Sequence, residues 1–162
     1  GIDILSFGAT KNGCWCAEAI VVFDKALDQQ MPFLRKRGAQ LFSKSRFVAA
    51  QFEAYFEGEL WLESARHANA MATALAGGIA ASGRARLHAR PQANEVFAIL
   101  ANTDIEQLRA AGAVFYDWHA PSDGSVRDGE TMIRLVTSFA TRPEDASSFI
   151  ATLNAQKVSA HV

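Results

Sequence analysis

The chain has 162 residues, of which 49% are hydrophobic, and a formal net charge of −1 at pH 7. This length can bury a substantial core and favours a globular domain, while the near-neutral charge gives no electrostatic basis for nucleic-acid binding. No apolar run approaches the roughly 20 residues that a membrane-spanning helix needs. The two cysteines, Cys14 and Cys16, provide neither a disulfide framework nor a zinc site, so we expect buried thiols in a reducing compartment.

Residues 1–23 are expected to form a strand, a loop and a second strand. The apolar residues 2–5 and 19–23 predict the two strands, and the loop between them is rich in small residues. Lys11 lies in this loop, just after the first strand. A desolvated lysine amine loses its proton easily and becomes nucleophilic, so Lys11 could hold a carbonyl cofactor as a Schiff base. The alternative is an ordinary solvated loop lysine.

Helices are predicted for most of residues 24–83. We expect a helix over residues 24–37 with a break near Pro32, another from residue 43, and an interruption at Gly58. The clearest helix follows and ends at Gly83. Its apolar residues recur at spacings of four and three, which places them on one packing face. They are Trp61, Ala65, Ala68, Ala72, Leu75 and Ile79.

After residue 84 the pattern changes to short strands and helices. Strands are predicted at residues 86–88, 96–100, 114–118 and 132–139, with an exposed loop at 121–129. Capping boxes at residues 103–106 and 141–144 predict two helix starts. The expected buried face of the last helix is Ala146, Phe149, Ile150 and Leu153, and the tail from Lys157 is expected to fray. This order predicts a small α/β unit with its helices on one face of a sheet.

Several segments resemble, in the same order, those of low-specificity threonine aldolases and the related phenylserine (β-hydroxy-amino-acid) aldolases. These are pyridoxal-phosphate enzymes of the aspartate-aminotransferase fold type. Matches that follow one family's order over nearly a whole chain are more specific than any single motif. The segments are ILSFGATKNG (residues 4–13), RKR (35–37), LFSKSRF (41–47), ARHANAMA (65–72) and IRLVT (133–137).

The resemblance implies that this α/β chain is the C-terminal part of a pyridoxal-phosphate-dependent transferase fold. Residues 1–45 would then be the end of the large cofactor-binding domain and its sheet. Residues 46–83 would be linking helices, and residues 84–162 a small C-terminal α/β domain. The N-terminal half of the same polypeptide would be missing from this sequence.

The resemblance also assigns roles to four residues. Lys11 would bind pyridoxal 5'-phosphate covalently, and Thr10 could hydrogen-bond near its phosphate, although a simple turn hydroxyl is an equal alternative. Lys44 lies at an expected helix start, where cations and the helix terminus both favour phosphate. Here the sequence departs from the family's glycine-rich Met-Arg-Gln setting. Arg134 would bind the substrate carboxylate through its planar fork, unless it faces solvent on an alternating strand.

The function that the resemblance implies is cleavage of threonine, allo-threonine or phenylserine to glycine and an aldehyde, the reaction of an aldehyde-lyase. We expect a cytoplasmic homodimer or homotetramer that acts on a small amino acid, without a metal and without nucleic-acid or membrane partners. The four histidines (67, 88, 119 and 161) match no catalytic residue, so the acid/base groups are expected in the N-terminal half. Alternatives are another enzyme of this cofactor class, either a β-eliminating lyase or an aminotransferase, and a non-enzymatic α/β binding domain.

Overall fold

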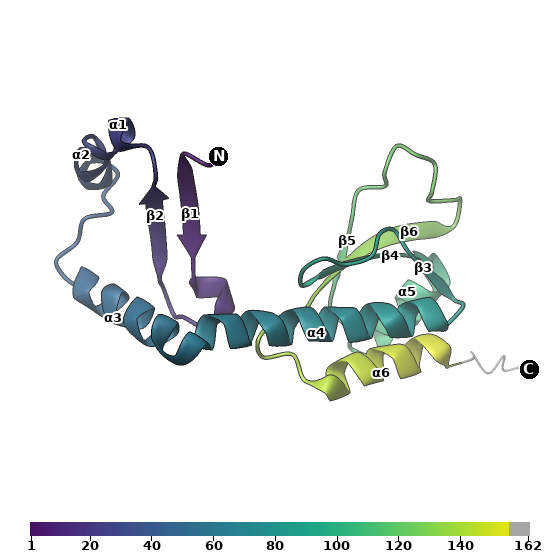
Figure 1. Cartoon of the computed structure of the whole chain (residues 1–162). Coiled ribbons are helices and arrows are strands. Elements are labelled where there is room, and N and C mark those ends of the chain that lie inside the picture. The colour runs from purple at the N-terminus through teal and green to yellow at the C-terminus, as the bar shows by residue number, and fades with distance from the viewer. Residues whose placement is uncertain (156–162) are drawn as a thin grey trace, which may run out of the picture. The chain divides into compact units, whose positions relative to one another are not determined.

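The computed structural model describes residues 1–155, so His161 and the tail from Lys157 lie outside the described residues. The chain divides into two compact units, Gly1–Ser64 and Ala65–Val162 (Figure 1). The division falls inside helix α4 (Leu60–Ala81), and each unit has a hydrophobic core of its own.

The first unit begins with the expected strand, loop and strand. Strands β1 (Ile4–Gly8) and β2 (Glu18–Val22) pair antiparallel, and a single 3-10 turn, η1 (Thr10–Asn12), follows β1. The remaining elements of this unit are α1 (Lys25–Asp28), α2 (Met31–Arg37), α3 (Ser45–Phe56) and η2 (Glu57–Glu59). Gly58 has a φ of +58°, in the left-handed region that favours glycine, which confirms the interruption expected there.

The helix break expected near Pro32 is present and lies just before it. Pro32 occupies the first turn of α2, where its missing N–H needs no partner, so the proline opens a helix instead of breaking one. The break itself is at Gln29 and Gln30, between α1 and α2.

The core of the first unit lies between the β1–β2 pair and α3. Ala9, Ala17 and Tyr55 are buried there, and the ring of Phe7 packs within 5.7 Å of the ring of Phe56. The other face of the strand pair carries exposed apolar residues, among them Ile4 and Ile20. The strand that precedes Lys11 is therefore exposed on this face, because two strands packed on one side only leave their second face uncovered.

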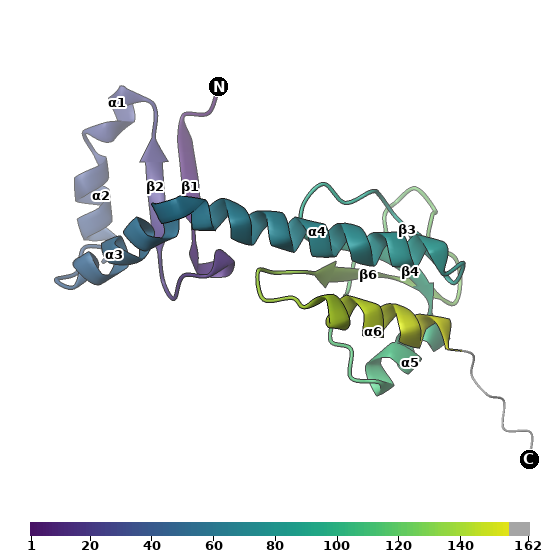
Figure 2. The ribbon, with the colours of Figure 1, turned by 60° about the horizontal axis from the view of Figure 1, so that its bottom comes forward.

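The second unit is a four-stranded antiparallel sheet with helices on one face. Its strand order is β3-β4-β6-β5, and α4, α5 and α6 lie on the same side of it (Figure 2). This confirms the predicted small α/β unit and the buried face of the last helix. The elements are β3 (Ala85–Leu87), β4 (Glu95–Ala101), α5 (Asn102–Ala110), β5 (Tyr116–Asp117), β6 (Glu130–Val136) and α6 (Pro143–Asn154).

Alternation along the strands separates the two faces of this sheet. Val96, Leu100 and Ile133 point inward and are less than 2% exposed, packed among residues of the three helices. Their neighbours along each strand therefore lie on the outer face, which includes Arg134.

Neither expected capping box forms with the predicted residues. No side-chain cap bond begins α5, which starts one residue before Thr103. At α6 the Asp145 carboxylate accepts from the backbone N–H of Arg142, at 3.0 Å. Thr141 does not cap the helix because its hydroxyl oxygen accepts from the Ser138 backbone N–H, at 2.8 Å, and so closes the preceding turn.

Helices α4 and α6 approach closely at Gly78. A Cβ on Gly78 would lie 2.6 Å from Ile150 Cγ1, whereas a Cβ on Gly77 would meet nothing within 4 Å. We expect Gly78→Ala to lower the free energy of unfolding by about 1–2 kcal/mol, because Ile150 must be displaced. Gly77→Ala should raise it by about 0.5–1 kcal/mol through helix propensity alone. Urea unfolding followed by circular dichroism compares the two; shifts of the same sign would contradict the close approach.

Candidate functional site

Lys11 is the central residue of the η1 turn, and its side chain is exposed. Within residues 1–155 the structure gives its amine neither a hydrogen bond nor an ion pair. The backbone N–H of Ala9 donates to the carbonyl of Ala17 at 2.7 Å, which closes the base of the loop. Gly13, with φ +117°, ends the turn in a conformation that favours glycine. The amine therefore projects from a short turn whose two ends are tied together.

A side-chain amide beside Lys11 anchors the turn to the helices. Asn12 Nδ2 donates to the Trp61 carbonyl oxygen at 3.1 Å and to the hydroxyl oxygen of Tyr55. Tyr55 is only 5% exposed, so this contact reaches into the core of the unit. No local sequence pattern indicates this contact, because the bonded residues are more than 40 positions apart.

A second anchor holds the segment that follows the turn. Gln51 Oε1, on α3, accepts from the backbone N–H groups of Trp15 at 2.9 Å and Cys16 at 3.0 Å. Burial raises the pKa of the Cys14 thiol, which disfavours the reactive thiolate form. Gln51 thus fixes the path of the chain after Lys11, and this segment is structural.

Thr10 and Lys44 have different surroundings. Thr10 Oγ1 accepts from the Ala17 backbone N–H at 3.1 Å, which is a turn-hydroxyl role. Lys44 is exposed at the N-terminal end of α3. At 1.5 Å per residue it lies about 16 Å along the helix from Tyr55, the residue that contacts the Lys11 turn. The structure thus places Thr10 at the turn and does not bring Lys44 beside it; the phosphate roles of both remain predictions.

Arg134 lies on the outer face of the second unit's sheet, where its side chain is 27% exposed. Its Nε donates to Glu95 Oε1 at 2.9 Å, and its Nη2 bonds to the same oxygen. The guanidinium carbon also lies 5.1 Å from the centre of the Trp118 ring. Arg134 is therefore held by two neighbours, neither of which was predicted. Pairing with Glu95 depends on the register of β4 against β6, which sequence patterns do not fix.

A second arginine on the same face has its own carboxylate. Arg86 Nη1 and Nη2 donate to Glu130 Oε1 and Oε2, at 2.7 Å and 2.8 Å. Nη2 also donates to the Ser125 carbonyl oxygen at 2.9 Å. Hydrogen bonds from Arg86 and from the Arg127 backbone lower the pKa of Glu130 to about 2. This pair ties the loop before β6 to β3.

The lowered pKa of Glu130 predicts a pH-dependent stability. A carboxylate with a folded pKa near 2 and an unfolded pKa of about 4.3 stabilises the fold above pH 4.3 and loses that effect as pH falls toward 2. Glu130→Gln should therefore lower the urea midpoint more at pH 7 than at pH 3. Glu106→Gln, at an exposed position on α5, is the control for replacing a carboxylate by an amide. An equal loss for Glu130→Gln at both pH values would contradict the ion pair.

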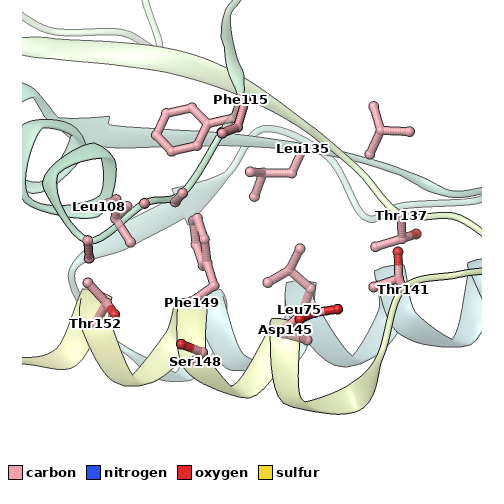
Figure 3. Close-up of a pocket in the computed structure, with 16 residues that line it drawn as sticks. Leu75, Leu108, Phe115, Leu135, Thr137, Thr141, Asp145, Ser148, Phe149 and Thr152 are labelled. Atoms are coloured by element: carbon pink, nitrogen blue, oxygen red, sulfur yellow. The ribbon is translucent and has the colours of Figure 1, made fainter.

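A cavity of about 360 Å³ lies between α5, α6 and the core face of the sheet (Figure 3). Leu108, Phe115 and Phe149 line it together with hydroxyl-bearing residues. Its one carboxylate, Asp145, accepts from Arg142 Nη2 at 2.8 Å, and that bond lowers the Asp145 pKa. Arg134 is on the opposite face, so the cavity is separate from the carboxylate candidate.

Three further features bear on the class of protein. Among residues 1–155 no cluster of His, Cys, Asp or Glu side chains could hold a metal ion. Within the same residues no helix is both long and apolar enough to cross a membrane. The His67 ring nitrogen Nε2 lies 2.7 Å from the Thr141 carbonyl oxygen, so this imidazole is hydrogen-bonded to the backbone just before α6.

The anchoring of the Lys11 segment can be measured by hydrogen exchange. Gln51→Ala removes the shared acceptor and should speed amide exchange of Trp15 and Cys16 by about fivefold or more, since each lost bond is worth roughly 1 kcal/mol. Gln51→Glu keeps an acceptor oxygen in place and should preserve protection. Unchanged exchange in Gln51→Ala would show that Gln51 does not hold this segment.

Comparison with known proteins gives a consistent result. No protein-family model matches the chain. A curated low specificity L-threonine aldolase of Pseudomonas aeruginosa is 40% identical over 116 residues, and one from Pseudomonas sp. (strain NCIMB 10558) is 38% identical over the same length. Each match covers 72% of this chain but 34% of the relative, so the chain spans about a third of their length.

A solved structure of the Leishmania major threonine aldolase has the same fold. It superposes with a TM-score of 0.83 and 32% identity. The match covers 93% of this chain and 42% of the solved one. The sequence and structure comparisons thus point to the same family, and each match covers only part of the relative's length.

Proposed function

Because this chain is homologous to one part of the low specificity L-threonine aldolases and has the fold of that part, we propose that it carries the cofactor lysine of an aldehyde-lyase. The reaction is cleavage of a β-hydroxy-α-amino acid (threonine, allo-threonine or phenylserine) to glycine and an aldehyde. The single observation that supports it best is the Lys11 turn, in which an amine without a partner among residues 1–155 stands on a fixed backbone.

The residues at this turn suit pyridoxal 5'-phosphate. The cofactor has an aldehyde that an unprotonated lysine amine can attack, and a phosphate that needs donors. Lys11 Nζ would hold the aldehyde carbon covalently. The Thr10 hydroxyl already accepts from Ala17, but its hydrogen is left to donate to an anion. Lys44, which the structure does not bring beside this turn, is proposed as a second phosphate residue on the resemblance alone. When bound, the cofactor supplies an electron sink for the broken bond.

The remaining roles belong to the substrate and to the rest of the polypeptide. Arg134 is proposed to bind the α-carboxylate, because a guanidinium matches a carboxylate with two parallel bonds. The groups that move protons are proposed to lie in an N-terminal half of the same polypeptide, which is consistent with matches to only about a third of each relative. We also propose a cytoplasmic homodimer or homotetramer, on the resemblance to enzymes that build their sites between subunits.

Product analysis of the complete polypeptide tests the reaction. With pyridoxal phosphate and threonine or phenylserine, we expect glycine and the matching aldehyde in equal amounts. Lys11→Ala should lower kcat by about 10³-fold or more, because the covalent anchor and its amine are lost. Lys25→Ala, at an exposed position of α1, is the control and should stay within about twofold.

Other outcomes lead to the other candidates. A keto acid product would indicate an aminotransferase or a β-eliminating lyase. A folded protein that never acquires cofactor absorbance would indicate a binding domain. Full turnover by Lys11→Ala would contradict the role of Lys11 in any of these enzymes.

A further inference from the structure

The two arginines on the outer face of the second unit's sheet use different edges of the guanidinium. Arg86 meets Glu130 with Nη1 and Nη2, so the end edge of its fork is filled by a carboxylate. Arg134 meets Glu95 with Nε and Nη2, which form the side edge. Among residues 1–155 no hydrogen-bond partner lies on Arg134 Nη1. The end edge of Arg86 is thus occupied by a carboxylate, whereas the end edge of Arg134 is, within the described residues, free to donate to a second one.

The plane of the Arg134 guanidinium is fixed as well as its edge. Trp118 covers one face, with the guanidinium carbon 5.1 Å from the ring centre. Trp118 is itself held in place. Its backbone N–H donates to the Met132 carbonyl oxygen at 2.8 Å, and the centre of its ring lies 5.5 Å from that of Phe97. Stacking sets the plane and Glu95 sets the rotation within it. The direction of the Nη1–Nη2 edge is then determined.

We propose that Glu95 is a positioning residue that holds Arg134 by its side edge, so that the end edge binds the substrate's α-carboxylate with two parallel hydrogen bonds. This inference rests on the proposed function of Arg134. A flexible arginine must lose side-chain freedom when it binds, whereas one already held by Glu95 and Trp118 has lost most of it. The charge of Glu95 acts in the opposite sense, because a second carboxylate nearby is repelled. If positioning dominates, removing the Glu95 side chain should weaken carboxylate binding; if repulsion dominates, it should strengthen that binding.

The test uses the complete polypeptide loaded with pyridoxal phosphate and two probes, glycine and glycinamide, which differ in the carboxylate. Calorimetric titration gives the Kd of each. Glu95→Ala removes the positioning acceptor and should weaken glycine about tenfold, or about 1.4 kcal/mol, while glycinamide stays within about twofold. Glu95→Gln keeps an acceptor oxygen for Arg134 and removes the charge, so glycine should bind as well as to the unaltered protein or more tightly.

A matched control comes from the other ion pair on this face. Glu130→Ala breaks the Arg86 pair without touching Arg134, and should leave the ratio of glycine to glycinamide affinity unchanged. In threonine cleavage, Glu95→Ala should raise KM by about the same tenfold and change kcat little, because carboxylate binding is common to the ground state and the transition state.

Several results would overturn the inference. If Glu95→Ala tightens glycine binding, Glu95 acts only as a competing charge. If it weakens both probes equally, its role is merely structural. If the unaltered protein binds the two probes equally, or binds neither, Arg134 does not recognise a carboxylate. Glycine binding requires no carbon–carbon cleavage, so failure of the aldolase reaction appears separately in product analysis.

Discussion

The placement of Lys11 depends on close packing beneath its turn. Ala9 and Ala17 flank the loop and are both fully buried, and the hydrogen bond from one to the other closes its base. A larger side chain at either position would push the turn away from α3. Tyr55 can then reach Asn12 from below, and Gln51 can reach the backbone beyond it. The small residues around Lys11 thus permit a buried contact and leave the amine exposed.

A comparable constraint acts on Arg134 in the second unit. The strand alternation that buries Ile133 and Leu135 against the helices leaves Arg134 on the outer face. Antiparallel register then brings it beside Glu95, and Trp118 stacks on it. Charge pairing, stacking and sheet geometry therefore act on one side chain. A solvated arginine does not need these contacts. The stacking of Trp118 on the guanidinium is the contact that distinguishes Arg134 from Arg86.

Much of the fold followed from local patterns. The alanine-lined face of α4, both strands of the first unit and the buried face of α6 were predicted because periodicity reports burial directly. The solved threonine aldolase confirms the fold class. The error at Thr141 came from competition between partners, because its hydroxyl accepts from Ser138 and does not cap α6. Pro32 does mark a helix boundary, but it begins α2, and the break lies just before it.

The site was predictable only in part. Lys11 and Arg134 were singled out through family resemblance, together with chemistry that suits their residue types. Glu95, Gln51 and Asn12 were missed because each acts through a contact 35 or more residues away, and no local pattern encodes such a pairing. The exposure of β1 was also missed, since the strand's apolar sequence does not reveal how many neighbours this chain provides for it.

The most direct measurement is borohydride reduction of the complete polypeptide after incubation with pyridoxal phosphate, followed by mass mapping of its peptides. A pyridoxyl group on Lys11 is the predicted result, because reduction traps the cofactor on the amine that holds it. A folded protein modified at another lysine, or not at all, would contradict the assignment of Lys11 as the cofactor residue.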